Sequence, residues 1–185
     1  MRVIAGKARR IKLIAPEGLK VRPTTDRIKE TLFNIINTDI IESNFLDIFS
    51  GSGAIGIEAL SRGANQAVFI DKDKLSIECI HKNLENTKLL DTAIVYNDYA
   101  TDGIQKLNER QMVFDFVFMD PPYNTGVEKA VLMTLKESTL ITKDTVIIIE
   151  NHIDSDVSYI ETIGYEITRV KQYKTNMHIF VKMKD

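Results

Sequence analysis

The sequence from residue 45 to residue 56 reads Phe45-Leu46-Asp47-Ile48-Phe49-Ser50-Gly51-Ser52-Gly53-Ala54-Ile55-Gly56. A short apolar run is followed by a turn with the spacing Gly-x-Gly-x-x-Gly, and then by residues that favour a helix. Glycines in such a turn allow tight backbone curvature and the close approach of a ligand. The stretch therefore predicts a buried strand, a ligand-binding turn and a helix in direct succession.

From residue 45 onward, apolar runs alternate with helical patterns. Predicted strands cover 45–49, 67–71, 93–96, 114–119 and 145–150, and predicted helices cover 54–61, 75–88, 100–108 and 127–137. Apolar strands separated by helices are typical of a parallel sheet with both faces covered. The last two runs, 165–173 and 178–183, are joined by four residues, which cannot form a right-handed crossover. We therefore expect a Rossmann-like, doubly wound α/β fold whose seven-stranded sheet is mostly parallel and ends in an antiparallel hairpin.

A second motif, Asp120-Pro121-Pro122-Tyr123, ends the apolar run over 116–119. In an open α/β sheet, ligands bind at the carboxyl ends of the strands. A carboxylate, two stiff prolines and an aromatic ring at that edge suit a planar group whose nitrogen must be held against a reactive partner. Taken alone, the four residues also fit an ordinary turn that closes a strand.

Two further acids bear on the cofactor. Asp71 ends the next predicted strand, twenty positions after Gly51, where a carboxylate can accept hydrogen bonds from a ribose diol. Asp98 follows the third strand and is placed to contact an adenine amino group. A dinucleotide would need a pyrophosphate seat and a second nucleotide half, for which this sheet leaves no place. S-adenosylmethionine has no phosphate and fits these positions better, with the turn at 50–53 beside its methionine portion.

Composition limits the class of protein. The 185 residues, 44% hydrophobic and 27% charged, suit one globular domain with a small appendage. The single Cys79 rules out a disulfide framework and a cysteine-rich metal site, and three scattered histidines argue against a catalytic metal. The sequence contains neither a signal peptide nor a long apolar run, so we expect a cytoplasmic protein with no membrane partner.

Basic residues are concentrated early in the chain. Residues 1–30 contain nine basic and three acidic side chains, although the whole chain has a formal net charge of -2. Such asymmetry is expected where one part of a protein contacts phosphates, although a solvated positive face would give the same count. We therefore divide the chain into a basic hairpin and helix over 1–37 and a catalytic domain over 38–185.

The sequence resembles the class I S-adenosylmethionine-dependent methyltransferases, and most closely the RsmD-type enzymes. Those enzymes methylate the exocyclic N2 of a guanine in bacterial small-subunit ribosomal RNA. The resemblance covers nearly the whole chain and rests on residues 2–7, 22–34, 46–53, 56–63 and 120–123. The block 22–34 is the most specific part, because other amino-methylating relatives share the Asp-Pro-Pro-Tyr motif but lack this block. Asn151 and His152 depart from the acidic pair expected after Glu150.

The resemblance implies a set of functional residues. Asp120 and the Pro121 carbonyl would accept hydrogen bonds from the guanine amine while Tyr123 stacks on the base, so that positioning drives the transfer. The expected catalytic residues are Asp120, Pro121, Pro122 and Tyr123. The expected cofactor-binding residues are Asp47, Phe49, Ser50, Gly51, Ser52, Gly53, Asp71, Lys72, Asn97, Asp98 and Asp120. The expected RNA contacts are Arg9, Arg10, Lys12, Arg22, Thr24 and Arg27, of which Thr24 and Arg27 could instead close over the cofactor.

The expected partner is 16S rRNA, in an assembled or partly assembled small ribosomal subunit, with the target base out of its stack. Three alternatives stay open. A DNA adenine N6 methyltransferase would need a target-recognition domain, for which the chain has no room. A protein glutamine methyltransferase would favour Asn in place of Asp120 and would lack the basic segment. A Rossmann oxidoreductase would need the second nucleotide half.

Overall fold

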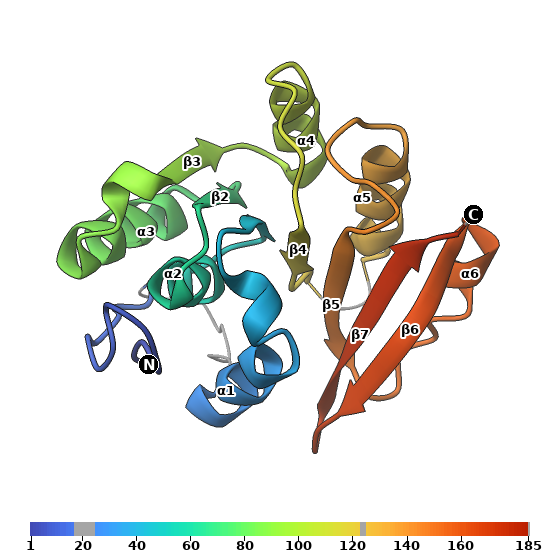
Figure 1. Ribbon diagram of the computed structural model, residues 1–185. Coiled ribbons are helices and arrows are strands. Elements are labelled where there is room, and N and C mark those ends of the chain that lie inside the picture. The colour runs from blue at the N-terminus through green and yellow to red at the C-terminus, as the bar shows by residue number, and fades with distance from the viewer. Residues whose placement is uncertain (17–24, 123–124, 185) are drawn as a thin grey trace.

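The computed structural model describes residues 1–16, 25–122 and 125–184. Within these ranges, seven strands form one sheet in the order β3-β2-β1-β4-β5-β7-β6 (Figure 1). The strands are β1 (Asn44–Ile48), β2 (Gln66–Asp71), β3 (Ala93–Asn97), β4 (Phe116–Met119), β5 (Val146–His152), β6 (Tyr165–Gln172) and β7 (Asn176–Met183). The helices are α1 (Asp26–Ile35), α2 (Ala54–Arg62), α3 (Lys74–Thr87), α4 (Ala100–Asn108), α5 (Val127–Lys136) and α6 (Tyr159–Thr162), with 3₁₀ turns η1 (Thr38–Ile40) and η2 (Leu90–Thr92). None of these described helices is long and apolar enough to cross a lipid bilayer.

Strands β1 to β5 run parallel, and β7 pairs antiparallel with both β5 and β6. The predicted doubly wound α/β fold with its antiparallel C-terminal hairpin is therefore confirmed. The hairpin's second strand, β7, is the one that joins the parallel strands, which leaves β6 at the edge. Helix α6 has only four residues, too few to produce a helical pattern in the sequence.

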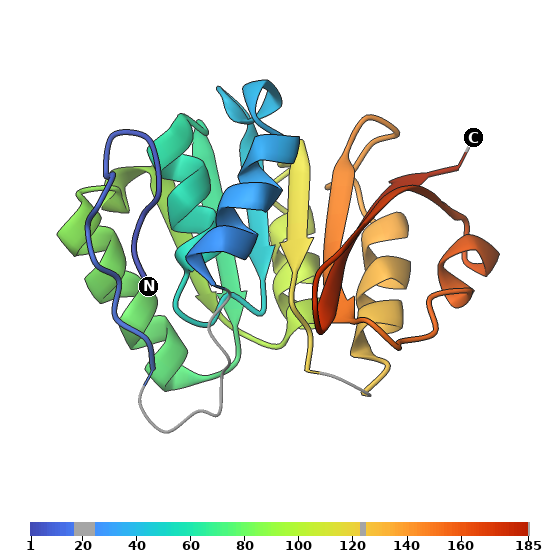
Figure 2. The same ribbon diagram turned by 90° about the horizontal axis from the view of Figure 1, so that it is seen from below.

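The sheet separates two apolar cores, because successive residues of a strand point to opposite faces. One core contains the Phe45, Phe69 and Phe118 rings, and Figures 1 and 2 show α1, α2 and α3 on one side of the sheet. The other core contains Ile48 and Val117, on the side that carries α4 and α5. Nearly continuous apolar strands are what a sheet covered on both faces requires.

Residues 1–14 double back on themselves beside α2 and α3 (Figure 2). The Val3 N–H donates to the Ile11 carbonyl and the Arg10 N–H donates to the Val3 carbonyl, both at 2.9 Å. The segment thus forms the expected small hairpin in a minimal form, with Arg9 and Arg10 exposed near its turn. Its position brings the basic residues over the helices that follow β1 and β2.

Candidate active site

Four carboxyl groups lie at the carboxyl ends of neighbouring strands. Asp47 and Asp71 belong to β1 and β2, Asp120 follows β4, and Glu150 lies near the end of β5. Asp47 interacts electrostatically with Asp71 and Asp120, and Asp120 with Glu150. Within the described part of the chain, no three His, Cys, Asp or Glu side chains are grouped so as to hold a metal ion. The fold therefore gathers acids from four separate sequence segments at one edge.

Asp47 lies beneath the glycine-rich turn. Its carboxylate accepts a hydrogen bond from the Gly56 N–H at 2.9 Å, and only 1% of the residue is exposed. Burial raises the pKa of Asp47 well above its usual range, the Gly56 hydrogen bond opposes that shift, and the charges of Asp71 and Asp120 add to it. The Asp47 carboxylate thus links the end of β1 to the first turn of α2, on either side of the glycine-rich turn.

The turn between β1 and α2 depends on its glycines. Gly53 precedes the helix with a left-handed backbone (φ 74°), and Phe49, the residue after β1, is also left-handed (φ 61°). A Cβ atom at Gly56 would lie 2.4 Å from the Phe69 ring. Helix α2 can therefore begin close against β2 only with glycine at this position.

Ser50 ties the turn to the neighbouring strand. Its hydroxyl donates to the Asp47 carbonyl at 2.6 Å and accepts from the Ile70 N–H at 3.1 Å. The next two residues, Gly51 and Ser52, are partly exposed. The turn thus presents backbone groups at the sheet edge while its side chains hold it in place.

Asp71 lies directly beside this turn. Its carboxylate accepts hydrogen bonds from the N–H groups of Gly51 (2.8 Å) and Asp73 (2.9 Å). Asn97 donates to the backbone oxygens of Asp71 and Lys72, which fixes the ends of β2 and β3 together. Each carboxylate oxygen can accept more than one hydrogen bond, so Asp71 keeps acceptor capacity for a ligand.

The loop after β3 adds an acid and an exposed ring. Asp98 forms an ion pair with Lys106 at 2.6 Å. Tyr99 is 64% exposed, and the Lys72 ammonium lies 5.5 Å from its ring centroid. Sequence reasoning missed Tyr99, although an aromatic residue directly after Asp98 is a usable signal for a ring-binding surface.

Asp120 begins the loop after β4. Burial, with a further contribution from the Glu150 charge, raises the pKa of Asp120 to about 8. Pro121 is buried and Pro122 is exposed, and the Thr125 hydroxyl donates to the Pro122 carbonyl at 2.8 Å. Tyr123 lies outside the described residues, and its stacking role stays a prediction.

Glu150 is the centre of a buried polar network that the sequence analysis did not identify. One carboxylate oxygen lies 3.2 Å from His178 Nε2, and the other accepts a hydrogen bond from the Asn176 amide. His178 Nδ1 lies 3.1 Å from the Tyr173 hydroxyl. His178 therefore connects the edge hairpin to the acid beside Asp120. The sequence does contain an indication that Glu150 lies in the site, because Glu150 ends an apolar run just as Asp120 does.

Basic residues line a cleft between the N-terminal segment and α1. The cleft has a volume of about 520 Å³, and its charged lining consists of Arg2, Arg9, Arg10, Asp26, Arg27 and Glu30. Arg2 is paired with Asp26 at 3.1 Å. Of the predicted RNA contacts, Arg9, Arg10 and Arg27 meet here, whereas Lys12 is exposed outside the lining. Arg22 and Thr24 lie outside the described residues. We call this feature the arginine cleft.

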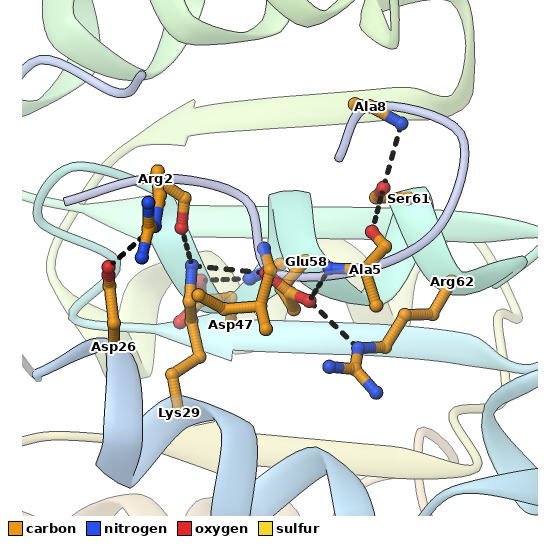
Figure 3. Close-up of polar contacts among 11 residues, drawn as sticks. Arg2, Ala5, Ala8, Asp26, Lys29, Asp47, Glu58, Ser61 and Arg62 are labelled. Atoms are coloured by element: carbon orange, nitrogen blue, oxygen red, sulfur yellow. Dashed lines mark hydrogen bonds and ion pairs between the residues drawn. The ribbon is translucent and has the colours of Figure 1, made fainter. Parts of the chain in front are cut away.

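A buried ion pair holds the N-terminal segment in place (Figure 3). Glu58 on α2 lies 3.1 Å from the Lys29 ammonium of α1, and both side chains are 0% exposed. Glu58 also accepts the N–H groups of Ile4 and Ala5, and Lys29 donates to the Arg2 carbonyl at 2.6 Å. Burial lowers the pKa of Lys29, while the Glu58 charge opposes that shift. The position of the arginine cleft is therefore fixed by buried charges.

Asn83 on α3 joins the N-terminal segment to the glycine-rich turn. Its amide group donates to the carbonyls of Ile14 and Ser52, both at 2.9 Å, and its oxygen accepts the Ile14 N–H at 2.9 Å. Asn83 is fully buried. One side chain thus connects the segment that carries the arginine cleft with the turn beside Asp71.

Comparisons with known proteins agree with this geometry. A family model described as "Conserved hypothetical protein 95" matches residues 1–182. The Ribosomal RNA small subunit methyltransferase D of Haemophilus influenzae is 38% identical over 157 residues, covering 83% of this chain and 80% of that protein. The Escherichia coli K12 protein of the same name is 33% identical over 155 residues, covering 84% and 76%. The solved structure of Escherichia coli yhhF superposes with a TM-score of 0.82 at 30% identity, covering 100% of this chain and 98% of that one.

Proposed function

Because the chain belongs to the family described as Conserved hypothetical protein 95, we propose that it is a ribosomal RNA methyltransferase. It transfers a methyl group from S-adenosylmethionine to the exocyclic N2 of a guanine in the 16S rRNA of a small ribosomal subunit. The named relatives, which are small-subunit rRNA methyltransferases, support this activity. The geometry of the site supports the assignment of individual residues to the steps of this activity.

The residues at the ends of β1, β2 and β3 fit S-adenosylmethionine. Asp71 offers acceptor capacity to a ribose diol, Asp98 and Tyr99 flank the position for an adenine ring, and Gly51 and Ser52 offer backbone groups to the amino acid portion. When bound, S-adenosylmethionine supplies an electrophilic methyl group on a positively charged sulfur. The acids gathered at this edge give that charge a favourable environment.

Asp120 is the proposed acceptor for the substrate amine. The lone pair of an exocyclic guanine amine is delocalised into the ring, so the nitrogen is a weak nucleophile. Hydrogen bonds from its N–H groups to the Asp120 carboxylate and the Pro121 carbonyl raise the electron density on nitrogen and fix its direction. Good alignment contributes on the order of 7–11 kcal/mol to such a reaction, so no separate general base is required.

The arginine cleft is the proposed contact for the RNA backbone. Arg9, Arg10 and Arg27 bring positive charge to the side of the site where the N-terminal segment meets α1. Phosphate contacts of this kind offset the few kcal/mol needed to extrude a stacked base. In this proposal residues 1–37 bind the RNA, residues 38–185 form the transferase domain, and the protein acts in the cytoplasm on assembled or partly assembled subunits.

The observation that carries the proposal is Asp120 beside Pro121 at the end of β4, next to a turn and an acid suited to the methyl donor. The test uses small subunits from cells in which the gene is deleted, incubated with the protein and methyl-labelled S-adenosylmethionine. Digestion of the RNA should give labelled N2-methylguanosine, and Asp120→Ala protein should give none. Label in N6-methyladenosine or in ribosomal protein would contradict the proposal.

A further inference from the structure

A second concentration of positive charge lies in the β6–β7 hairpin. Residues 165–184 contain five basic side chains and one acidic one, whereas residues 31–164 contain 10 basic and 21 acidic ones. The five are Arg169, Lys171, Lys174, Lys182 and Lys184. The sequence therefore has an acidic middle and two basic regions, of which only the first contributes to the arginine cleft.

The hairpin turn lies at the same edge of the sheet as Asp120. Asn176, the first residue of β7, pairs with His152, the last residue of β5. The turn over 173–175 therefore extends past the carboxyl end of β5, and β5 is the neighbour of the strand that leads into Asp120. Figure 2 shows the hairpin curving forward on the side of the sheet that carries α1.

Two of the basic residues near this turn share that face of the sheet. Lys171 is paired with His178 and Arg169 with Phe180 across β6 and β7, and directly paired residues project to the same face. The His178 ring packs edge-on against Phe118, with 6.0 Å between centroids. Phe118 belongs to the core beneath α1. Arg169 and Lys171 therefore project from the face of the sheet that carries α1, and α1 forms one wall of the arginine cleft.

Hydrogen bonds of Tyr173 anchor the turn. The Tyr173 hydroxyl lies 3.1 Å from His178 Nδ1, whose other ring nitrogen lies 3.2 Å from Glu150. The Tyr173 N–H also donates to the Asn176 carbonyl at 2.8 Å. Burial raises the pKa of Tyr173 to about 12, so its hydroxyl remains protonated and available to the histidine. A surface fixed before binding loses less conformational entropy when a partner binds.

The charges on this surface are not neutralised. Arg169 and Lys174 are exposed and Lys171 is half-buried. None of the three forms an ion pair with another residue in the described ranges. By contrast, Lys106 beside the cofactor position is paired with Asp98. Unpaired cations on this turn and on the strand that leads into it are suited to phosphate groups.

We propose that Arg169, Lys171 and Lys174 form a second phosphate-contacting surface, which holds the RNA backbone on the opposite side of Asp120 from the arginine cleft. Figure 1 supports this arrangement: the N-terminal segment lies beside α2 and α3, on one side of β4, whereas β6 and β7 lie past β5 on the other side. The inference rests on the proposed function, since it takes RNA as the substrate. A strand bound at both surfaces would cross the carboxyl edge of the sheet at Asp120.

The test removes two charges from this surface and compares the result with a matched loss elsewhere. The variant is Lys171→Ala/Lys174→Ala. The control is Lys182→Ala/Lys88→Ala, which removes one half-buried and one exposed lysine. Lys182 lies opposite Glu166 in the strand register near the far end of the hairpin, and Lys88 directly follows α3, at the opposite edge of the sheet from Asp120. Binding of the rRNA in small subunits from cells in which the gene is deleted is measured by co-sedimentation from 50 to 200 mM KCl, and binding of S-adenosylhomocysteine by calorimetry.

The variant should bind the RNA on the order of tenfold more weakly at 100 mM KCl, with a salt slope smaller by about 1.4–1.8, because two phosphate contacts are lost. Its affinity for S-adenosylhomocysteine should equal that of the wild type. RNA affinity and salt slope equal to those of the control would overturn the inference. If the variant then also self-associates, the lysines serve to protect the edge strand from pairing with other chains and do not contact RNA. The binding result does not depend on turnover, so wild-type protein that binds RNA without methylating guanine would contradict only the proposed function.

Discussion

Asp120 and Glu150 stand side by side at the carboxyl edge of the sheet, because the residues before them, Met119 and Ile149, are paired across β4 and β5. Two neighbouring acids in a low-dielectric site resist ionising together. Burial, reinforced by the Glu150 charge, accordingly raises the pKa of Asp120 to about 8. The protonation state of the proposed amine acceptor is therefore set partly by a residue on the next strand.

We expect kcat/KM for S-adenosylmethionine to rise with pH to a plateau above about pH 8. Only the ionised form of Asp120 can both accept the N–H hydrogen bonds of the amine and balance the positive charge that develops on its nitrogen. Below the midpoint the parameter should fall about tenfold per pH unit, as for a single essential ionisation. Steady-state kinetics between pH 6 and 9.5 measure the profile. Glu150→Gln should move the midpoint to lower pH, since it removes a charge that raises the Asp120 pKa. An unchanged midpoint would show that the two acids are not coupled.

Asp120→Asn should abolish turnover and at the same time stabilise the ligand-free protein above neutral pH. The folded-state pKa of Asp120 is raised above its unfolded value of 3.8, so the native state binds more protons between about pH 4 and 8. The free energy of unfolding of the wild type therefore falls as pH rises through that window. The amide in the variant does not ionise, so the variant does not lose stability in this way. At pH 8.5 urea unfolding should show the variant more stable by at least about 1 kcal/mol, with the difference vanishing near pH 4. Equal stability at both pH values would contradict the raised pKa.

Lys29→Met should destabilise the protein by about 3 kcal/mol, because it removes one of the two cations, Lys29 and Arg62, that pair with the buried Glu58 carboxylate. Lys82→Met, which removes an exposed lysine on α3, is the control and should change stability little. Denaturant unfolding measures both. Hydrogen exchange should also accelerate at the Ile4 and Ala5 amides, which donate to Glu58. Protection at these amides equal to that of the wild type would show that Lys29 does not hold the segment.

Asn83→Asp should weaken S-adenosylhomocysteine binding about fivefold, because the variant loses the donor to the Ser52 carbonyl and about 1 kcal/mol of positioning energy with it. Asn86→Asp makes the same chemical change at an exposed position of α3 and serves as the control. Calorimetry measures both affinities. If the two variants bind equally well, the connection through Asn83 does not support the turn.

Arg9→Ala/Arg10→Ala should weaken 16S rRNA binding and reduce its salt slope by about 1.4–1.8, because two phosphate contacts are removed from the arginine cleft. Lys82→Ala/Lys88→Ala instead removes one exposed charge on α3 and one directly after it, and should leave the slope unchanged. Binding of S-adenosylhomocysteine reports whether the fold is intact. An unaltered slope in the arginine variant would exclude the cleft as an RNA contact.

The fold was predictable because each element carries its own local signal. The glycine spacing at 51, 53 and 56 identifies the first strand–turn–helix unit, and the short link between β6 and β7 leaves only an antiparallel pairing. These signals act over a few residues and need no tertiary information. The position of Asp120 at a strand end followed from the same reasoning.

The supporting contacts of the site could not be predicted in this way. Glu58 and Lys29 lie 29 positions apart and become a pair only when α1 packs against α2. Glu150 and His178 likewise meet only through the β5–β7 register. A lone charged residue in an apolar pattern indicates that a partner exists, but the sequence does not say which residue it is.

The insertion of β7 between β5 and β6 has a consequence for synthesis of the chain. β5 (Val146–His152) is translated before the strand that covers its outer edge. Until residues 179–181 have emerged, the run Ile147-Ile148-Ile149 presents unpaired backbone groups on an apolar strand, an arrangement prone to pair with other chains. Expression of a fragment that stops before β7 should therefore give insoluble protein, whereas in the full chain β7 covers this edge of β5.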